Sequence, residues 1–147
     1  SCTIPIMKTK NAASLPSDDR SRTLKEKTAE TAKLYFAGYP GDKPFDLWRS
    51  FDTDLAKDMS LYITGQMYAR QKLPHPTRQL VAISALTALG RDDELRLHIW
   101  AGLNVGLTAE EIAEAIFQVG VYAGVPLVNQ ALKVLRDVLD TRESGDE

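Results

Sequence analysis

The stretch TAEEIAEAIFQVGVYAGVPLVNQALKVLRDVL, residues 108–139, decides the fold class. Thr108 and Glu111 at its start form a Thr-x-x-Glu capping box, in which each side chain accepts a hydrogen bond from the other residue's backbone N–H. Apolar residues then recur every three or four positions, which is the period of an amphipathic helix. The Gly-Val-Pro sequence at 124–126 stops this helix, and the leucines within 127–139 predict the last one. The stretch therefore predicts two consecutive helices.

Two more helices are predicted immediately upstream. The sequence Leu-Pro-His-Pro at 73–76 stops one helix and starts the next, because proline lacks an N–H and fits the first turn of a helix. That next helix, from Pro76, runs through a dense apolar segment to Leu89. Gly90 and Gly106 are expected to be stops, one after this helix and one after a helix over residues 92–105.

The N-terminal half also follows helical periods. Good helix formers from 24 to 39 predict a first helix that ends in the turn Gly-Tyr-Pro-Gly at 38–41. Aromatic and large apolar residues then recur over 45–62, which predicts an amphipathic helix that continues or restarts through 63–69. Strand-like alternation of useful length is missing from the sequence. We therefore expect an all-α fold, a bundle of six to seven helices.

The two ends of the chain lack such a pattern. Residues 1–22 are rich in Ser, Thr, Pro, Asn and charge, and we expect either a flexible arm or an arm that wraps around an oligomer. Residues 142–147 are expected to form a charged tail. Residues 23–141 predict one domain, because a chain of 147 residues is too short for two substantial cores.

Composition and charge argue against several partners. Lys and Arg number 18 against 20 Asp and Glu, a net charge of -2, which gives no general attraction to nucleic acid or acidic membranes. The longest apolar run, 80–89, is too short to cross a bilayer. Cys2 is the single cysteine, so an intrachain disulfide or thiolate metal cage cannot form. With no secretory signal visible, we expect a cytoplasmic protein.

Two of the expected helices suggest self-association. Those over 76–89 and 109–124 are apolar on more than one face, which in so small a domain indicates burial by a second subunit. The alternative is that both are central helices of a monomer. We expect a homo-oligomer.

Arg91, Glu94 and His98 are a candidate acid–base constellation. Their i, i+3, i+7 spacing places all three on one face of a helix. The histidine could transfer a proton, the carboxylate could orient it, and the arginine could bind a substrate carboxylate. The alternative is a solvated helix face with an Arg–Glu pair.

Other polar residues are less specific. Arg78 and Arg70 could supply positive charge to a pocket between helices, or they could lie in solvent. Gln118 and Tyr122 are polar positions on an otherwise apolar helix, where burial would require partners. His75, between two prolines, is expected to have a surface or turn role.

Several chemistries lack their motifs. Cys-x-x-Cys, His-Glu-x-x-His, Gly-x-Gly-x-x-Gly and phosphate-loop patterns are missing, and the chain has 2 histidines. Ser84 lies in a helical pattern without the Gly-x-Ser-x-Gly elbow of a serine hydrolase. The sequence therefore gives no support for a metal-dependent, nucleotide-dependent, thiol or serine-nucleophile mechanism.

The stretch 73–139 resembles the carboxymuconolactone decarboxylase family. The motifs that carry the resemblance are Thr-Arg at 77–78, Ala-Leu-Gly-Arg at 88–91, Glu-Leu-Arg-Leu-His at 94–98, Gly-Leu-Thr at 106–108, Glu-Glu-Ile at 110–112 and Val-Tyr-Ala-Gly-Val-Pro at 121–126, with Gly65, Tyr68, Arg70 and Leu73 upstream. Alkylhydroperoxidase-like relatives carry Cys-x-x-Cys and, four residues later, His. Here those places hold Arg91, Glu94 and His98, so the resemblance implies the decarboxylase branch and not thiol peroxidase chemistry.

The resemblance implies a helical subunit in a ring-like trimer or hexamer, with pockets near the subunit contacts. It implies cofactor-free decarboxylation of 4-carboxymuconolactone to the β-ketoadipate enol-lactone in aromatic catabolism. Loss of carbon dioxide would give a furanolate, and protonation beside the carbonyl would give the product. One departure bears on the substrate: Gln118 stands where many decarboxylases of the family have His.

For this reaction we expect His98 to donate the proton and Glu94 to orient the His98 ring. Arg91 and Arg78 are expected to contact a carboxylate or the oxyanion. Further pocket candidates, with no metal ligand among them, are Arg70, Gln118 and Tyr122. Two alternatives stay open: an enzyme of this fold acting on another lactone or carboxylic acid, and a non-catalytic oligomer that binds a small molecule.

Overall fold

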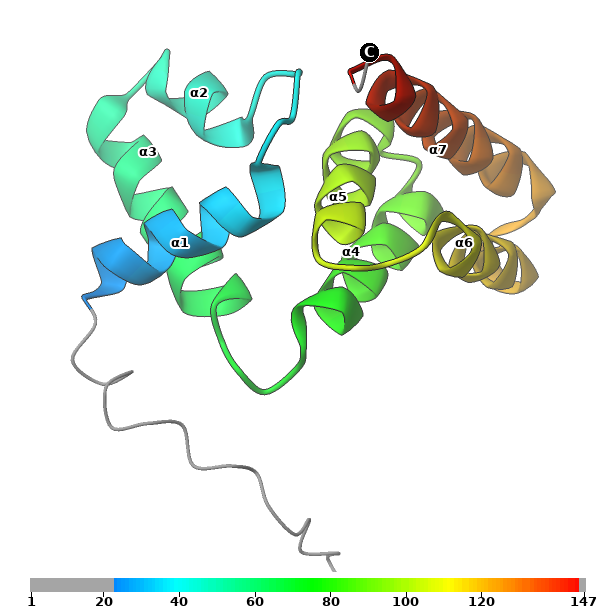
Figure 1. Ribbon diagram of the computed structural model, residues 1–147, viewed down its shortest axis with the longest axis horizontal. Coiled ribbons are helices and arrows are strands. Elements are labelled where there is room, and N and C mark those ends of the chain that lie inside the picture. The colour runs from blue at the N-terminus through cyan, green and yellow to red at the C-terminus, as the bar shows by residue number, and fades with distance from the viewer. Residues whose placement is uncertain (1–22, 146–147) are drawn as a thin grey trace, which may run out of the picture.

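The computed structural model describes residues 23–145, and every regular element in that range is helical. The elements are α1 (Leu24–Phe36), α2 (Pro44–Arg49), α3 (Thr53–Ser60), the π-helix η2 (Leu61–Tyr68), α4 (His75–Leu89), α5 (Asp92–Asn104), α6 (Ala109–Ala123) and α7 (Val125–Gly145). Because η2 follows α3 without a break, the two form one rod (Figure 1). The expected all-α bundle is confirmed for this part of the chain.

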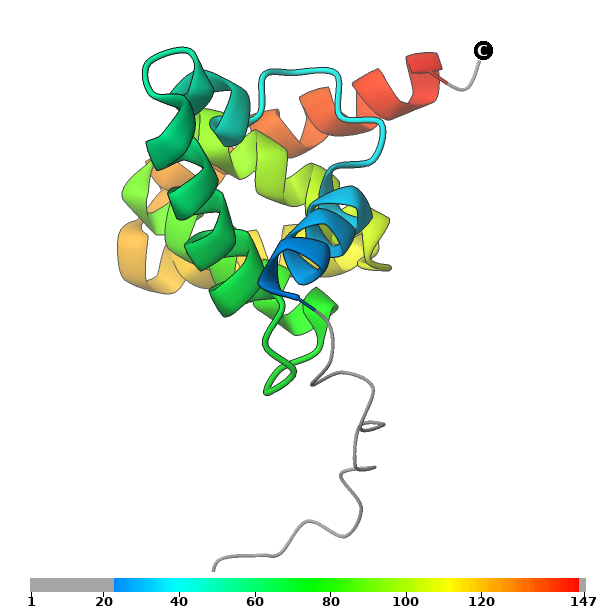
Figure 2. The same ribbon diagram turned by 90° about the vertical axis from the view of Figure 1, so that its left-hand side faces the viewer.

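The helices form two groups, and the contiguous core lies in one of them. Helices α4 to α7 pack against one another, and α1 packs on both η2 and α5. Figures 1 and 2 show α1 beside the α3–η2 rod, with the α2–α3 hairpin at the edge of the molecule. The buried core runs from Ile83 to Val138 and so belongs to the C-terminal group and its connections. Among the described residues, no helix has the length and apolarity needed to span a membrane.

The predicted helix boundaries around α5 and α6 are confirmed. Thr108 and Glu111 cap α6 reciprocally, with a backbone N to side-chain oxygen distance of 3.1 Å in each direction. Gly90 ends α4 with φ 67° and ψ 34°, a left-handed conformation that disfavours residues with a Cβ.

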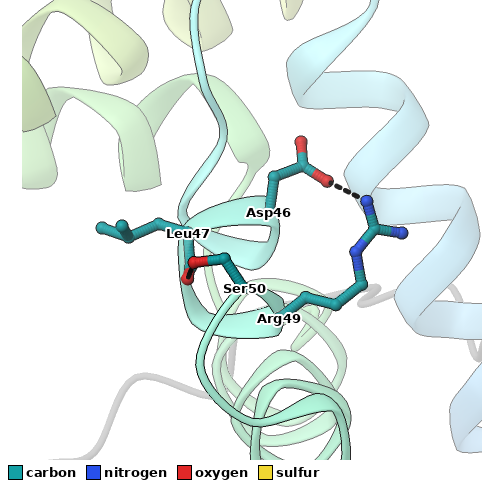
Figure 3. Close-up of polar contacts among 4 residues, drawn as sticks. All are labelled: Asp46, Leu47, Arg49 and Ser50. Atoms are coloured by element: carbon teal, nitrogen blue, oxygen red, sulfur yellow. Dashed lines mark hydrogen bonds and ion pairs between the residues drawn. The ribbon is translucent and has the colours of Figure 1, made fainter.

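The single amphipathic helix expected over 45–62 is wrong, because the chain breaks at 50–52. The Asp52 side chain accepts a hydrogen bond from the Leu55 backbone N–H at 2.9 Å and so caps a new helix, α3. Ser50 Oγ donates to the Leu47 carbonyl at 2.6 Å and satisfies the end of α2 (Figure 3). These local hydrogen bonds compete with the backbone hydrogen bonds that would continue the helix through this segment.

Side chains from α5 and α7 fix the end of α1. Trp100 Nε1 donates to the Ala37 carbonyl at 3.0 Å, and Asn104 Nδ2 donates to the Tyr35 carbonyl at 2.8 Å. The Arg142 guanidinium lies over the Trp100 ring, 4.5 Å from its centroid. The last turn of α1, which carries Tyr35, is therefore anchored to the C-terminal group.

The ends of the domain differ from the sequence expectation in one respect. Helix α7 continues past Thr141 to Gly145, through part of the range expected to be a charged tail. The arm expected over 1–22 lies outside the described residues.

Candidate active site

A cavity of about 700 Å³ lies between α1, the α2–α3 hairpin, η2 and α5. We call it the main cavity. Its apolar wall is formed by Phe36, Phe45, Trp48, Leu61, Ile63 and Leu97. Its polar lining includes Tyr35, Tyr68 and His98, together with Lys25, Lys43 and Lys57. The cavity thus combines apolar surface with a few convergent polar groups, as small-molecule sites do.

His98 is held by two neighbours. Its Nδ1 lies 2.9 Å from Oε1 of Gln79, a fully buried residue of α4. With that oxygen as acceptor, the neutral imidazole carries its proton on Nδ1 and keeps the Nε2 lone pair free. Tyr68 stacks on the imidazole with centroids 5.8 Å apart and an interplanar angle of 18°. These contacts fix the ring at the wall of the main cavity.

Tyr35 extends the polar cluster to His75. Its hydroxyl is hydrogen-bonded to His75 Nδ1, and the two rings meet edge to face at 5.0 Å. Tyr35 also packs edge to face on Tyr68 at 5.5 Å. The polar cluster therefore draws on helices α1, η2, α4 and α5, and consists of Tyr35, Tyr68, His75, Gln79 and His98.

Burial sets the protonation states of this cluster. It lowers the pKa of His98 to about 4, and Glu94 opposes that change only in part. Burial also raises the pKa of Tyr35 to about 12, and it raises the pKa of Tyr68. At neutral pH the free protein therefore holds a neutral imidazole and two protonated phenols at the cavity wall.

The predicted Arg–Glu–His constellation is only partly assembled. His98 lines the main cavity, and exposed Glu94 lies close enough to raise its pKa. Arg91 is the exposed N-cap residue of α5, with φ -97° and ψ 85°, so it leaves the helical face that the spacing implied. The geometry brings together two of the three residues.

Arg78 and Arg70 meet, but through a backbone carbonyl. Arg78 donates to the Arg70 carbonyl from Nε at 3.1 Å and from Nη2 at 2.7 Å. The Arg78 charge also lowers the pKa of Tyr35, Tyr68 and His75, which places it near the polar cluster. Arg70 lines a separate hollow of about 460 Å³.

Gln118 and Tyr122 lie elsewhere. Both are exposed on α6, which packs on α4 and α7, and neither lines the main cavity. Tyr122 is 85% exposed, and helices α4 and α6 also expose the apolar side chains of Val81, Leu89, Phe117 and Val121.

Sequence reasoning missed three members of the polar cluster. Neither Tyr35 nor Gln79 was singled out, and His75 was expected to have a surface or turn role. The available signal was Gln79, a polar residue directly before the apolar run 80–89 of the same helix, because a buried amide requires partners. Its Nε2 has no hydrogen-bond partner of normal geometry among the described residues.

The charge around the main cavity favours an anion. The acidic residue in its lining is Asp46, whose Oδ1 lies 3.3 Å from Nη2 of Arg49 on the same helix (Figure 3). Three lysines in the same lining outnumber this paired carboxylate. Within residues 23–145, no group of three or more His, Cys, Asp or Glu side chains is arranged to hold a metal ion.

Comparison with known proteins adds a family to this geometry. Residues 53–137 match the model of the Carboxymuconolactone decarboxylase family, which is more than half of the chain. The chain belongs to the carboxymuconolactone decarboxylase family. The family resemblance stated from the sequence is thereby confirmed. The matched range includes His75, Gln79 and His98 but not Tyr35, which α1 contributes.

Two curated relatives are similar over part of their length. A 4-carboxymuconolactone decarboxylase of Acinetobacter baylyi is 41% identical over 88 residues, which cover 60% of this chain and 66% of that protein. An uncharacterized 15.0 kDa protein in the nqo9-nqo10 intergenic region of Paracoccus denitrificans is 36% identical over 76 residues, 50% of this chain and 57% of that protein. The matched part of the chain therefore spans less than two thirds of each relative.

Proposed function

We propose that the protein is a cofactor-free decarboxylase of a carboxylated lactone, with 4-carboxymuconolactone as its substrate. The observation that carries the proposal is the main cavity itself, where a neutral His98 and two protonated tyrosines face a lining with three lysines. Family membership and the relative from Acinetobacter baylyi support the choice of substrate.

The reaction would proceed through a stabilised anion. As the carboxylate carbon leaves as carbon dioxide, its bonding electrons move through the ring double bond into the lactone carbonyl, giving a furanolate. The hydroxyl groups of Tyr35 and Tyr68 can donate hydrogen bonds to that oxyanion, and the Arg78 charge favours it. The apolar wall would promote charge dispersal by excluding water.

His98 is proposed as the acid that protonates carbon. Its free-state pKa of about 4 leaves it neutral, but a bound dianion would favour its charged form and raise that pKa. His98 would thus gain its proton together with the substrate, and Glu94 would support the charge. Arg91, Gln118 and Tyr122 lie on exposed surfaces and would take part only across a subunit contact.

Self-association is part of the proposal. The exposed apolar side chains of α4 and α6, Tyr122 among them, are of the kind that subunit contacts cover, and we propose a trimer or hexamer. A monomer at micromolar concentration in light scattering would contradict this. The single cysteine suits the reducing cytoplasm, where we propose that the enzyme works.

The function is tested with purified protein, chelator and freshly generated 4-carboxymuconolactone. Ultraviolet absorbance would follow the enol-lactone while released carbon dioxide is measured in parallel. We expect equal amounts of both products without added cofactor. Product formation no faster than the spontaneous reaction would contradict the proposed substrate, and turnover of another lactone acid would indicate the altered-substrate enzyme.

A further inference from the structure

Tyr35 and His75 connect two separate spaces in the molecule. Tyr35 lines the main cavity, whereas His75 lines the second hollow, which is walled by α1 and the loop before α4. The hollow is bordered by Lys27, Glu30, Thr31, Leu34, residues 69–71 and residues 73–75. The hydrogen bond between the Tyr35 hydroxyl and His75 Nδ1 joins the two.

The proposed reaction needs such a connection. Replacing a carboxylate by hydrogen takes up one proton in each turnover, and that proton must come from solvent. Tyr35 is 1% exposed, so its hydroxyl reaches solvent poorly by itself. His75 is only half-buried and lines the second hollow, and its bond to Tyr35 uses Nδ1, so Nε2 is not engaged by that bond.

We propose that His75 and Tyr35 form a proton-entry path from the second hollow to the main cavity, and this inference rests on the decarboxylase function proposed above. His75 acts through Tyr35 and does not touch the substrate. The path supplies His98, which shares two neighbours with Tyr35: Tyr68 contacts both rings, and Gln79 is near both.

Each transfer along the path is balanced. Water in the hollow gives a proton to His75 Nε2, and the imidazole releases its Nδ1 proton to the Tyr35 oxygen. Tyr35 releases its own hydroxyl proton into the cavity, where the His98 Nε2 lone pair accepts it in the presence of bound anion. His98 then protonates the substrate carbon, so one solvent proton replaces one carboxylate. Before the next turnover the His75 ring takes up a solvent proton at Nδ1 and returns the one at Nε2, which restores its starting tautomer.

The charges around His75 suit a carrier that does not retain its proton. Burial, and secondarily the Arg78 charge, lower the pKa of His75 below its ordinary value. Lys27, Arg70 and Glu30 border the same hollow. A histidine that stays neutral between transfers can pass a proton without trapping it.

Hydroxyl exchange in the full-length protein tests the path without any substrate. The exchange rate of the Tyr35 hydroxyl with solvent is read from the hydrogen–deuterium isotope shift of its ring carbon Cζ. His75→Gln keeps a hydrogen-bonding side chain but cannot shuttle a proton, and we expect Tyr35 exchange to slow at least about tenfold. Tyr68, half-buried and not bonded to His75, is the internal control and should be unchanged. Equal Tyr35 rates in both proteins would overturn the proposal.

Steady-state kinetics provide a second test of the path. In His75→Gln we expect kcat to fall about tenfold or more with KM little changed. In His75→Gly, added imidazole should restore turnover in proportion to its concentration. A structural role for His75 would give no such rescue, and that result would contradict the path. Absence of turnover in the wild-type protein would contradict the proposed function but not the proton path. The hydroxyl-exchange measurement would still show whether the path exists.

Discussion

The group of helices α4 to α7 and the group formed by α1, α2, α3 and η2 differ in what their side chains bury. The first contains the contiguous core, with Ile83, Leu95, Ile99 and Ile112 at no more than 1% exposure. In the second, α2 has no buried residue, and α3 and η2 each bury one small residue. One half of the molecule thus stabilises the fold, and the other directs its apolar surface into the main cavity.

This difference has a chemical consequence. The well-packed group supplies His98 and Gln79, whose geometry is set by the core behind them. The loosely packed group supplies the aromatic wall and the lysines that would meet a ligand. Precise positioning and accommodation of a substrate are therefore assigned to different helices.

The largest contrast should appear in core and wall truncations. Ile99→Ala removes a fully buried core side chain of α5 and should lower the free energy of unfolding by about 2–5 kcal/mol. Leu61→Ala on the cavity wall should cost no more than about 1 kcal/mol, because it enlarges an existing space. Urea denaturation of the two variants measures both. Equal losses would show that the wall is also part of the stabilising core.

A smaller effect is expected from acid. Since the folded-state pKa of His98 is lowered from 6.5 to about 4, the unfolded chain binds a proton there before the folded protein does. The free energy of unfolding should therefore fall as the pH drops from 6.5 toward 4, and this component should be lost in His98→Gln. Denaturation of both proteins at several pH values would show it. Parallel curves would place His98 in a more solvated environment than its contacts indicate.

The smallest effect concerns the seam between α1 and η2. A Cβ on Gly65 would lie 2.2 Å from Thr28 Oγ1 and 2.9 Å from Leu24 Cδ1, so the two helices approach closely there. Gly65→Ala should destabilise the protein by about 1–2 kcal/mol, because overpacking outweighs the better helix propensity of alanine.

The matched control is the double variant Thr28→Ala with Gly65→Ala. Removing the Thr28 hydroxyl, which donates to the Leu24 carbonyl at 2.7 Å, removes the closest clash. Thermal unfolding should show recovery of part of the loss relative to Thr28→Ala alone. If Gly65→Ala melts like the wild-type protein, the close approach is not a constraint.

Local signals predicted the fold well, and long-range contacts limited the prediction of the site. The Thr108 capping box and the Gly90 stop depend on residues within one helical turn, so both could be read directly. The break before α3 was also local, in the capping side chain of Asp52, but the apolar period across it concealed the signal.

The polar cluster could not be predicted in the same way. Tyr35 and His75 lie 40 positions apart, and Gln79 and His98 lie 19 positions apart, so tertiary packing alone joins them. The spacing of Arg91 and His98 predicted that both lie on one helical face. This was wrong for a local reason, because α5 begins at Asp92 and Arg91 lies outside the regular helix.

The most direct test of the central claim, that the main cavity is the decarboxylation site, is the turnover of His98→Gln on 4-carboxymuconolactone. Glutamine keeps much of the volume but cannot serve as the acid. With an unchanged circular dichroism spectrum, kcat should fall about 10²–10⁴-fold relative to wild type. Full turnover by this variant would contradict the assignment and move the chemistry away from the cavity.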